Sequence, residues 1–379
     1  MVHHGEMIPT QRLPASLTPL DVALAALLQR VTPVAPVSLS LAEALGCVAA
    51  DMPPLQAVPR RDTAASDGWA LRARDLVGAS SYTPLPLARP PVWVEAGDAM
   101  PEDCDCVVDA DSVDHAGSRF QMLAEAIPGQ GVRRAGADIA EGKSVIAPSR
   151  RIRRIDLLGA RAAGLQSLNV RRPRLRLVDI PANSGYTDTV QLIAELAGAA
   201  GASTARAKAG GRDAASTAKA IEPGDCDLLV TIGGSGVGRT DAAIAALAAR
   251  GEVVAHGIAV QPGRTAAVGR IGKIPVVALP GAPDQALAAW LTLVLPVLDR
   301  LSGLAPRQSI TLPLARKIAS SVGIGEIVLL ERTENAWMPL AIGEMPLATI
   351  ARSDAWLLAP GGSEGFAAGA PVDAYMLRD

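Results

Sequence analysis

Segments typical of strands and helices alternate regularly between residues 174 and 301. The periodicity predicts this order: strand 175–180, helix 188–200, strand 202–207, helix 213–221, strand 227–232, helix 241–250, strand 253–260, strand 275–279 and helix 284–301. Such alternation indicates a parallel, doubly wound α/β sheet with helices on both faces. Because ligands of such sheets bind at the carboxyl ends of the strands, the loops that follow the strands are the expected place for a site.

Two of these loops contain glycine. Residues 233–238, Gly-Gly-Ser-Gly-Val-Gly, follow strand 227–232, and residues 280–283, Pro-Gly-Ala-Pro, follow strand 275–279. Glycines permit positive φ and let backbone N–H groups approach a ligand, and the start of the next helix favours an anion. We therefore expect the two loops to form one anion site.

The first loop also nearly fits the phosphate-loop pattern GxxxxGK[ST], with Arg239 in place of the lysine. No aspartate follows strand 275–279 to hold Mg²⁺, which that class of nucleoside triphosphatase requires. The near-match to this motif is the one feature that keeps an unrelated enzyme acting on a nucleotide phosphate as an alternative interpretation. A purely structural strand-to-helix turn stays open as well.

Composition excludes several classes of protein. The 379 residues carry a net charge of −2 and few aromatic side chains, which argues against a nucleic-acid surface. The sequence has no apolar run long enough to span a membrane and no signal peptide, so we expect a cytoplasmic protein. The spacing of the four cysteines matches no zinc-binding motif, and four are too few for a disulfide framework. We therefore expect their thiols to be buried or to have no chemical role.

The chain is long enough for several domains. Sequence patterns typical of helices predict a helical linker domain over 10–30 and 143–172. The first helix has an N-cap at Thr18 and a proline at its first position. Proline-punctuated short runs predict an inserted β-rich domain over 31–142. The α/β domain covers 173–304, and strand-like text predicts a small C-terminal β domain over 305–379.

Eleven arginines lie between Arg133 and Arg176. This cluster fits either a surface for a polyanion or acidic partner, or a solvated helix face with its flanks.

Three aspartates stand in suggestive surroundings, and each also has a structural explanation. Asp241 at a helix start fits an N-cap, and Asp67 before Gly68 fits a hairpin turn. Asp138 follows Arg133 closely and fits a weak surface ion pair. Small residues before Asp67 would leave room for a ligand.

Taken together, these segments resemble the MoeA family, the molybdopterin molybdenumtransferases related to the E domain of gephyrin. Residues 65–70 resemble the family's SAMDGYA, 96–101 its TGAxxP, 133–138 its RxxGxD, 233–241 its GGxSxGxxD, 262–265 its PGKP and 279–283 its LPGNP. The motifs occur in the family's order over nearly the whole chain. That order is far more specific than any one of them.

The resemblance implies the four-part architecture above, with a MogA/MoaB-like molybdopterin-binding α/β domain. It implies a homodimer whose site lies between the α/β domain of one subunit and the inserted domain of the other. There, adenylated molybdopterin and molybdate become molybdenum cofactor and AMP, with Mg²⁺. The residues that would bind the pterin and its phosphate are Gly233, Gly234, Ser235, Gly236, Gly238, Arg264, Pro280, Gly281 and Pro283.

The same resemblance gives catalytic roles to Asp67, Asp138 and Asp241, with Asp241 as a candidate ligand of Mg²⁺. It also suggests a molybdopterin adenylyltransferase and apo-molybdoenzymes as partners, with neither nucleic acid nor membrane.

Several motif residues depart from the family pattern. The family's threonine is Ala96, its serine Gly236, its lysine Arg264 and its asparagine Ala282, and the acidic TGDEL loop is replaced at residues 181–184. Such losses remove hydrogen bonds and weaken a Mg²⁺ site. A carrier paralogue that binds molybdopterin or molybdenum cofactor without insertion activity is therefore the alternative function.

Overall fold

The computed structural model describes residues 11–116, 119–181 and 188–377. The chain divides into two compact units. The larger unit contains Met1–Ala50, Pro148–Ile152 and Asn169–Asp379, and the smaller unit contains Asp51–Ala147 and Arg153–Leu168. The finer division into four domains stays a prediction.

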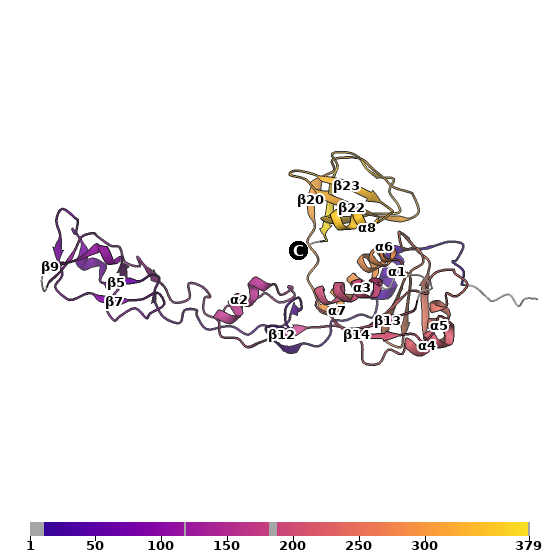
Figure 1. Ribbon diagram of the computed structural model, residues 1–379, viewed down its shortest axis with the longest axis horizontal. Helices are drawn as coiled ribbons and strands as arrows, with labels where there is room; N and C mark the ends of the chain where they lie inside the picture. Colours follow the sequence, from indigo (N-terminus) through magenta and orange to yellow (C-terminus); the bar gives the residue numbers. More distant parts are fainter. Residues whose placement is uncertain (1–10, 117–118, 182–187, 378–379) are drawn as a thin grey trace, which may run out of the picture. The chain divides into compact units, whose positions relative to one another are not determined.

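The centre of the larger unit is a six-stranded sheet in the order β14-β13-β15-β19-β18-β16. Two of its strands, β13 and β14, are labelled in Figure 1. Its parallel strands are β14 (Ser203–Lys208), β13 (Arg174–Asp179), β15 (Leu228–Ile232) and β19 (Ile274–Leu279). Connections run outward in opposite directions from β13 and β15, so the topological switch point lies between these two strands. The α/β class is confirmed.

One edge of the sheet corrects the all-parallel prediction. Strand β18 (Ala267–Ile271) pairs antiparallel with β19, and β16 (Glu252–His256) pairs antiparallel with β18. The predicted strand 253–260 is wrong as one element, because Gly257 at φ 84° breaks it. The second half, β17 (Ile258–Gln261), joins a different sheet between β1 (Thr18–Pro19) and β22 (Gly325–Arg332).

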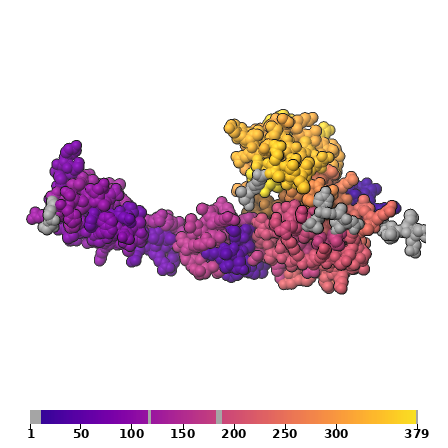
Figure 2. Space-filling view, in the orientation of Figure 1, coloured from indigo at the N-terminus to yellow at the C-terminus, as the bar shows by residue number. Residues whose placement is uncertain are grey.

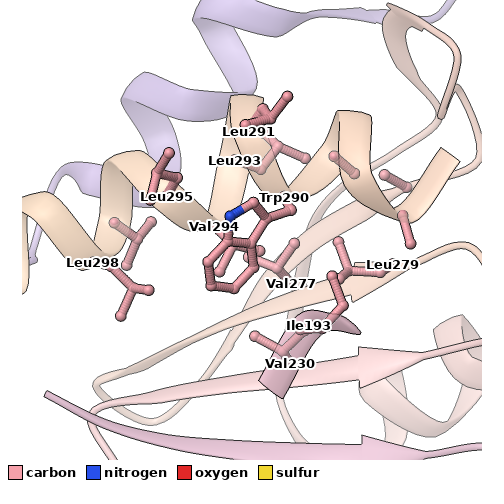
Figure 3. Packing of buried hydrophobic residues seen from close by; sticks show 14 of the residues in the cluster. Ile193, Val230, Val277, Leu279, Trp290, Leu291, Leu293, Val294, Leu295 and Leu298 are labelled. Carbon is pink, nitrogen blue, oxygen red and sulfur yellow. The ribbon is translucent and has the colours of Figure 1, made fainter. Parts of the chain in front are cut away.

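Successive residues of the parallel strands point to opposite faces, as the pleat requires. Leu177, Val230 and Val277 belong to the main core, where Trp290 is buried (Figure 3). Val178, Leu229 and Val276 face a second cluster with residues of α4 (Ala214–Ala220) and α5 (Ala243–Arg250) or their ends. Both faces of the sheet are therefore covered, as the sequence predicted.

The helices on the main-core face are α1 (Leu20–Leu28), α3 (Asp188–Ala199), α6 (Pro283–Ala289), a π-helical segment (Trp290–Val294) and α7 (Leu295–Ser302). The single helix predicted over 284–301 therefore has a π-helical middle. The predicted N-cap at Thr18 is wrong, because Thr18 and Pro19 pair with β17 as a strand and α1 begins at Leu20.

The C-terminal residues form the small β structure that the sequence predicted, drawn in yellow in Figure 2. Trp337, Leu330 and Leu357 are buried in its own core. Its elements are β20 (Ile310–Pro313), β21 (Ile318–Ala319), β22, β23 (Trp337–Ile342), α8 (Leu347–Arg352), β24 (Ala355–Ala359), β25 (Gly365–Phe366) and β26 (Pro371–Met376). Short strands β2 (Val37–Ser40), β3 (Val48–Ala49) and β12 (Ser167–Arg171) form a further sheet.

The smaller unit is rich in short strands, as predicted. One sheet contains β7 (Val92–Val94), β5 (Gly68–Leu71) and β8 (Cys106–Val108), and another contains β6 (Leu85–Pro86), β10 (Arg119–Met122) and β9 (Val113–Ala116). Strands β4 (Thr63–Ala64) and β11 (Val132–Arg133) pair with each other, and α2 spans Arg154–Ala162. Leu76 and Met122 are fully buried in its core.

The four cysteines are free thiols, as expected, and Cys47, Cys106 and Cys226 are buried. Burial raises the pKa of Cys106 to about 12 and that of Cys226 to about 11. Across the described ranges, no helix is long and apolar enough to cross a membrane.

Candidate functional site

Four loops meet at the carboxyl edge of the six-stranded sheet. Pro181 follows β13, residues 233–241 follow β15, and residues 280–283 follow β19. Residues 262–265 belong to the same edge, because Ala267 at the start of β18 pairs with Ala278 near the end of β19. The edge contains the switch point between β13 and β15, where ligands of such sheets bind.

The two glycine-containing loops are neighbours, as the sequence predicted. The N–H of Gly233 donates to the carbonyl of Leu279 at 3.0 Å. A Cβ atom on Gly281 would lie 3.5 Å from the Cα of Gly233. The Thr189 hydroxyl in the first turn of α3 donates to the Gly281 carbonyl at 2.8 Å and fixes the second loop.

The four glycines of the first loop serve two different purposes. Gly233 and Gly234 have φ of 91° and 69°, which glycine adopts without strain. Gly236 and Gly238 do not have positive φ. There, a Cβ atom would lie 2.6 Å and 2.9 Å from Oδ2 of Asp241, so these glycines make room for a carboxylate.

Asp241 braces the loop. Its Oδ1 accepts from Arg212 at 2.6 Å and its Oδ2 from the N–H of Gly238 at 2.9 Å. Arg212 also donates to the Thr240 hydroxyl at 2.9 Å and the Pro181 carbonyl at 2.6 Å, so one guanidinium joins the ends of two strands. The predicted N-cap role of Asp241 is wrong, because α5 begins at Ala243 with Ala242 as its N-cap.

The N-terminus of α5 is capped from a remote part of the chain. Oε1 of Gln11 accepts from the N–H of Ile244 at 2.8 Å, and its Nε2 donates to the Gly234 and Gly236 carbonyls. The sequence predicted that the N–H groups at the start of this helix would bind an anion. In the structure, the side chain of Gln11 accepts from them instead. Sequence reasoning missed Gln11 and Arg212, because neither lies in a motif of the loop.

Ser235 lies in the interior of the loop and is fully buried. Its carbonyl lies 3.0 Å from Nε2 of His256, which must be the donor because a carbonyl oxygen only accepts. Its hydroxyl has no hydrogen-bond partner among the described residues. His256 lies outside all six motif segments of the sequence.

The remaining predicted binding residues also lie at this edge. Arg264 is exposed, as is Arg239 in the first loop. In the described part of the chain, neither guanidinium has an ion-pair or hydrogen-bond partner, so both remain available to an anion. Pro280 is buried, and Pro283 begins α6 at its first position.

Asp67 and Asp138 lie in the smaller unit and are exposed. Oδ1 of Asp67 accepts from the N–H of Ala96 at 2.8 Å, which joins two of the motif segments. Asp138 lies 3.6 Å from Arg133, the weak ion pair that its sequence context suggested. The hairpin prediction for Asp67 is wrong, because the flanking strands β4 and β5 pair with other strands.

The arginine cluster has partly structural explanations. Ion pairs join Arg133 to Asp138, Arg153 to Asp156 and Arg174 to Asp227. These contacts support the solvated-surface interpretation for those arginines.

Mg²⁺ needs several oxygen ligands. Within the residues described, no group of three or more His, Cys, Asp or Glu side chains could hold a metal ion. Asp241 would have to share its oxygens with Arg212 and Gly238. The described residues by themselves therefore do not fit a Mg²⁺ site, and residues 182–184 of the altered acidic loop lie outside them.

Two family models match this chain. Residues 18–164 match the MoeA N-terminal region (domain I and II), and residues 181–300 match the probable molybdopterin binding domain. Molybdopterin molybdenumtransferase 2 of Mycobacterium tuberculosis is 28% identical over 310 residues, which cover 71% of this chain and 76% of that protein. A putative molybdopterin biosynthesis protein of Methanocaldococcus jannaschii is 25% identical over 352 residues, covering 85% and 87% of the two chains.

A crystal structure of a molybdopterin biosynthesis MoeA protein from Pyrococcus horikoshii has the same fold, with a TM-score of 0.72. That comparison covers 95% of this chain and 100% of the other at 21% identity. The two matched regions together span most of the chain and contain all six motif segments. The chain belongs to the MoeA family of molybdenum cofactor biosynthesis proteins.

Proposed function

We propose that this protein binds adenylated molybdopterin at the carboxyl edge of the sheet and inserts molybdate with release of AMP. The observation that carries the proposal is the meeting of loops 233–241, 262–265 and 280–283 at the switch point of the sheet. Relatives with this architecture are named molybdopterin molybdenumtransferases.

The chemistry of the edge suits a phosphate-bearing ligand. Arg239 and Arg264 are exposed cations on the loops, and arginine binds phosphate oxygens in a bidentate manner. The absence of a side chain at Gly236, which is not buried, lets backbone N–H groups of the loop approach the ligand. Arg212 and Asp241 hold the loop in one conformation before the ligand arrives, which lowers the ordering cost of binding.

Asp67 and Asp138 are proposed to act on the bound substrate from the smaller unit of the other subunit in a homodimer. Their support is their exposure and the assembly of segments 65–70, 96–101 and 131–138 around them. A carboxylate can hold a water or accept a proton during cleavage of the phosphoanhydride. No step is assigned to Mg²⁺, which supplies charge neutralisation where it is bound.

The test supplies the purified protein with adenylated molybdopterin, molybdate and Mg²⁺ and measures AMP release and activation of an apo-molybdoenzyme. We expect both, with no AMP released when molybdate is omitted. Tight binding without AMP release would instead show the carrier function. Absence of binding would contradict both.

A further inference from the structure

Residues 11–19, which we call the strap, lie along the larger unit. Thr18 and Pro19 pair with β17, and the N–H of Thr18 donates to the Gly257 carbonyl at 2.9 Å. A Cβ atom on Gly257 would lie 3.1 Å from side-chain atoms of Leu13, Pro14 and Leu17, so the strap packs closely over this glycine. These contacts anchor the strap without help from the glycine loop.

Gln11 at the other end of the strap uses its full hydrogen-bonding capacity on the loop and helix. Nε2 donates to the Gly234 carbonyl at 3.0 Å and the Gly236 carbonyl at 2.8 Å. Oε1 accepts from the N–H groups of Ile244 at 2.8 Å and Ala245 at 3.4 Å. A primary amide offers two donors and one oxygen acceptor, so the side chain is satisfied on both sides.

These bonds fix the direction of the loop's N–H groups. In a trans peptide the carbonyl and the N–H point in opposite directions. Holding the Gly234 and Gly236 carbonyls therefore turns the N–H groups of Ser235 and Val237 away from Gln11. His256 does the same for the N–H of Gly236 by holding the Ser235 carbonyl.

Ser235 is fully buried, but the next two N–H groups, those of Gly236 and Val237, are oriented by side chains outside the loop and belong to residues that are not buried. Among the residues that the structure describes, neither of these two N–H groups has an acceptor. Successive backbone N–H groups in a loop of this kind are effective donors to phosphate oxygens. The exposed Arg239 lies two residues further along.

We propose that Gln11 is a positioning residue for an anion site formed by the N–H groups of Gly236 and Val237. The identity of the ligand, a phosphate or phosphoanhydride, rests on the proposed function. The Gly234 carbonyl also accepts from the N–H of Ala243 at 3.0 Å, so it stays held without Gln11. The Gly236 carbonyl can then rotate toward the ligand, and an acceptor replaces the N–H of Val237 in the site. Gln11 itself does not touch the ligand.

Two substitutions separate this role from a structural one. Gln11→Glu keeps an acceptor for the helix N–H groups, where its charge is favourable, but at neutral pH it cannot donate to the carbonyls. Gln11→Ala removes both functions. We therefore expect Gln11→Glu to have a Tm close to wild type and Gln11→Ala a lower one.

Affinity is expected to follow a different order. The Kd for adenylated molybdopterin, measured by titration calorimetry, should rise about tenfold in both variants, and at least as much in Gln11→Glu as in Gln11→Ala. Ser16→Ala is the matched control, because this exposed strap residue has no hydrogen bond among the described residues, and its Kd and Tm should match wild type. Wild-type affinity in Gln11→Glu, or affinity that follows Tm across the variants, would overturn the inference.

Amide hydrogen exchange keeps this test separate from the proposed function. Both Gln11 variants should exchange faster than wild type over residues 233–240 without any ligand. If wild-type protein fails to bind adenylated molybdopterin, the proposed function is contradicted. The rate of amide hydrogen exchange still shows whether Gln11 orders the loop. Unchanged exchange over 233–240 in both variants would overturn the role of Gln11.

Discussion

The carboxylates of the two units are held in contrasting ways. Asp241 in the larger unit is 12% exposed, and both its oxygens are bonded, one to an arginine that is itself 21% exposed. Asp138 in the smaller unit is 40% exposed and lies 3.6 Å from an arginine that is 57% exposed. The larger unit therefore offers a preorganised loop, whereas the smaller unit offers accessible carboxylates.

This difference indicates a division of labour. A loop whose conformation is fixed in advance suits tight binding, because little order has to be gained on association. An exposed carboxylate with weak partners can reorient toward a ligand at small cost. We infer that affinity resides mainly in the larger unit and that the smaller unit contributes mainly to the chemical step.

Replacing a glycine by alanine should change the free energy of unfolding very differently in the smaller unit and in the glycine loop of the larger unit. A Cβ atom on Gly68 would lie 2.2 Å from the backbone oxygen of Val108, so Gly68→Ala should separate β5 from β8 and lower the free energy of unfolding by about 3 kcal/mol. Gly236→Ala meets only the end of the Asp241 side chain and should cost about 1 kcal/mol while weakening ligand binding. Urea unfolding measures both changes.

Gly198→Ala is the control for these substitutions. Gly198 lies in α3 with nothing within 4 Å of its would-be Cβ, so alanine should stabilise the protein slightly. A Gly68→Ala protein as stable as wild type would contradict the close approach of β5 and β8.

Double-mutant cycles compare the two ion pairs directly. Because Arg212 and Asp241 are mostly shielded from water and joined at 2.6 Å, we expect a coupling of about 2 kcal/mol. The exposed pair Arg133 and Asp138 should couple by less than about 0.5 kcal/mol. Equal coupling energies for the two pairs, measured by urea unfolding, would contradict the view that the carboxylate of the larger unit is held more firmly than that of the smaller unit.

Asp67→Asn should separate chemistry from stability. The substitution keeps an acceptor for the N–H of Ala96, so the free energy of unfolding should change by less than about 0.5 kcal/mol. AMP release should fall about tenfold or more, with the Kd for adenylated molybdopterin nearly unchanged. An equal loss of affinity would place Asp67 among the binding residues instead.

The smallest effects concern one buried thiol in each unit. Burial raises the pKa of Cys106 to about 12 and of Cys226 to about 11, so at pH 8 the reactive thiolate is scarce in the folded protein. Both should resist alkylation until urea exposes them, and half-buried Cys104 should react first. Mass spectrometry of the alkylated peptides reports each site, and fast labelling of Cys226 in folded protein would contradict its burial.

The sequence predicted most of the sheet because local periodicity and burial agree there. Leu228–Ile232 and Ile274–Leu279 are apolar runs buried in the structure, and glycine loops follow them. The failure at residues 253–260 has a local cause, since Gly257 ends one strand and directs the next into another sheet. No periodicity signals that change of sheet.

The site was predictable only in part, for a related reason. The glycines and Asp241 carry a motif within nine residues, but Gln11 reaches Gly234 across 223 positions. The residues next to Gln11 and Arg212 in the sequence carry no signal that either side chain bonds to a remote loop rather than to water. The role of Gly236 was also misjudged, since the carboxylate beside it rather than a positive φ requires glycine.

The central claim is that the loops at the carboxyl edge of the larger unit's sheet bind the substrate. Hydrogen exchange with and without adenylated molybdopterin tests it directly at peptide resolution. We predict protection over residues 233–241 and 280–286, and none over the C-terminal β strands. Binding with protection absent from both loops would contradict the account.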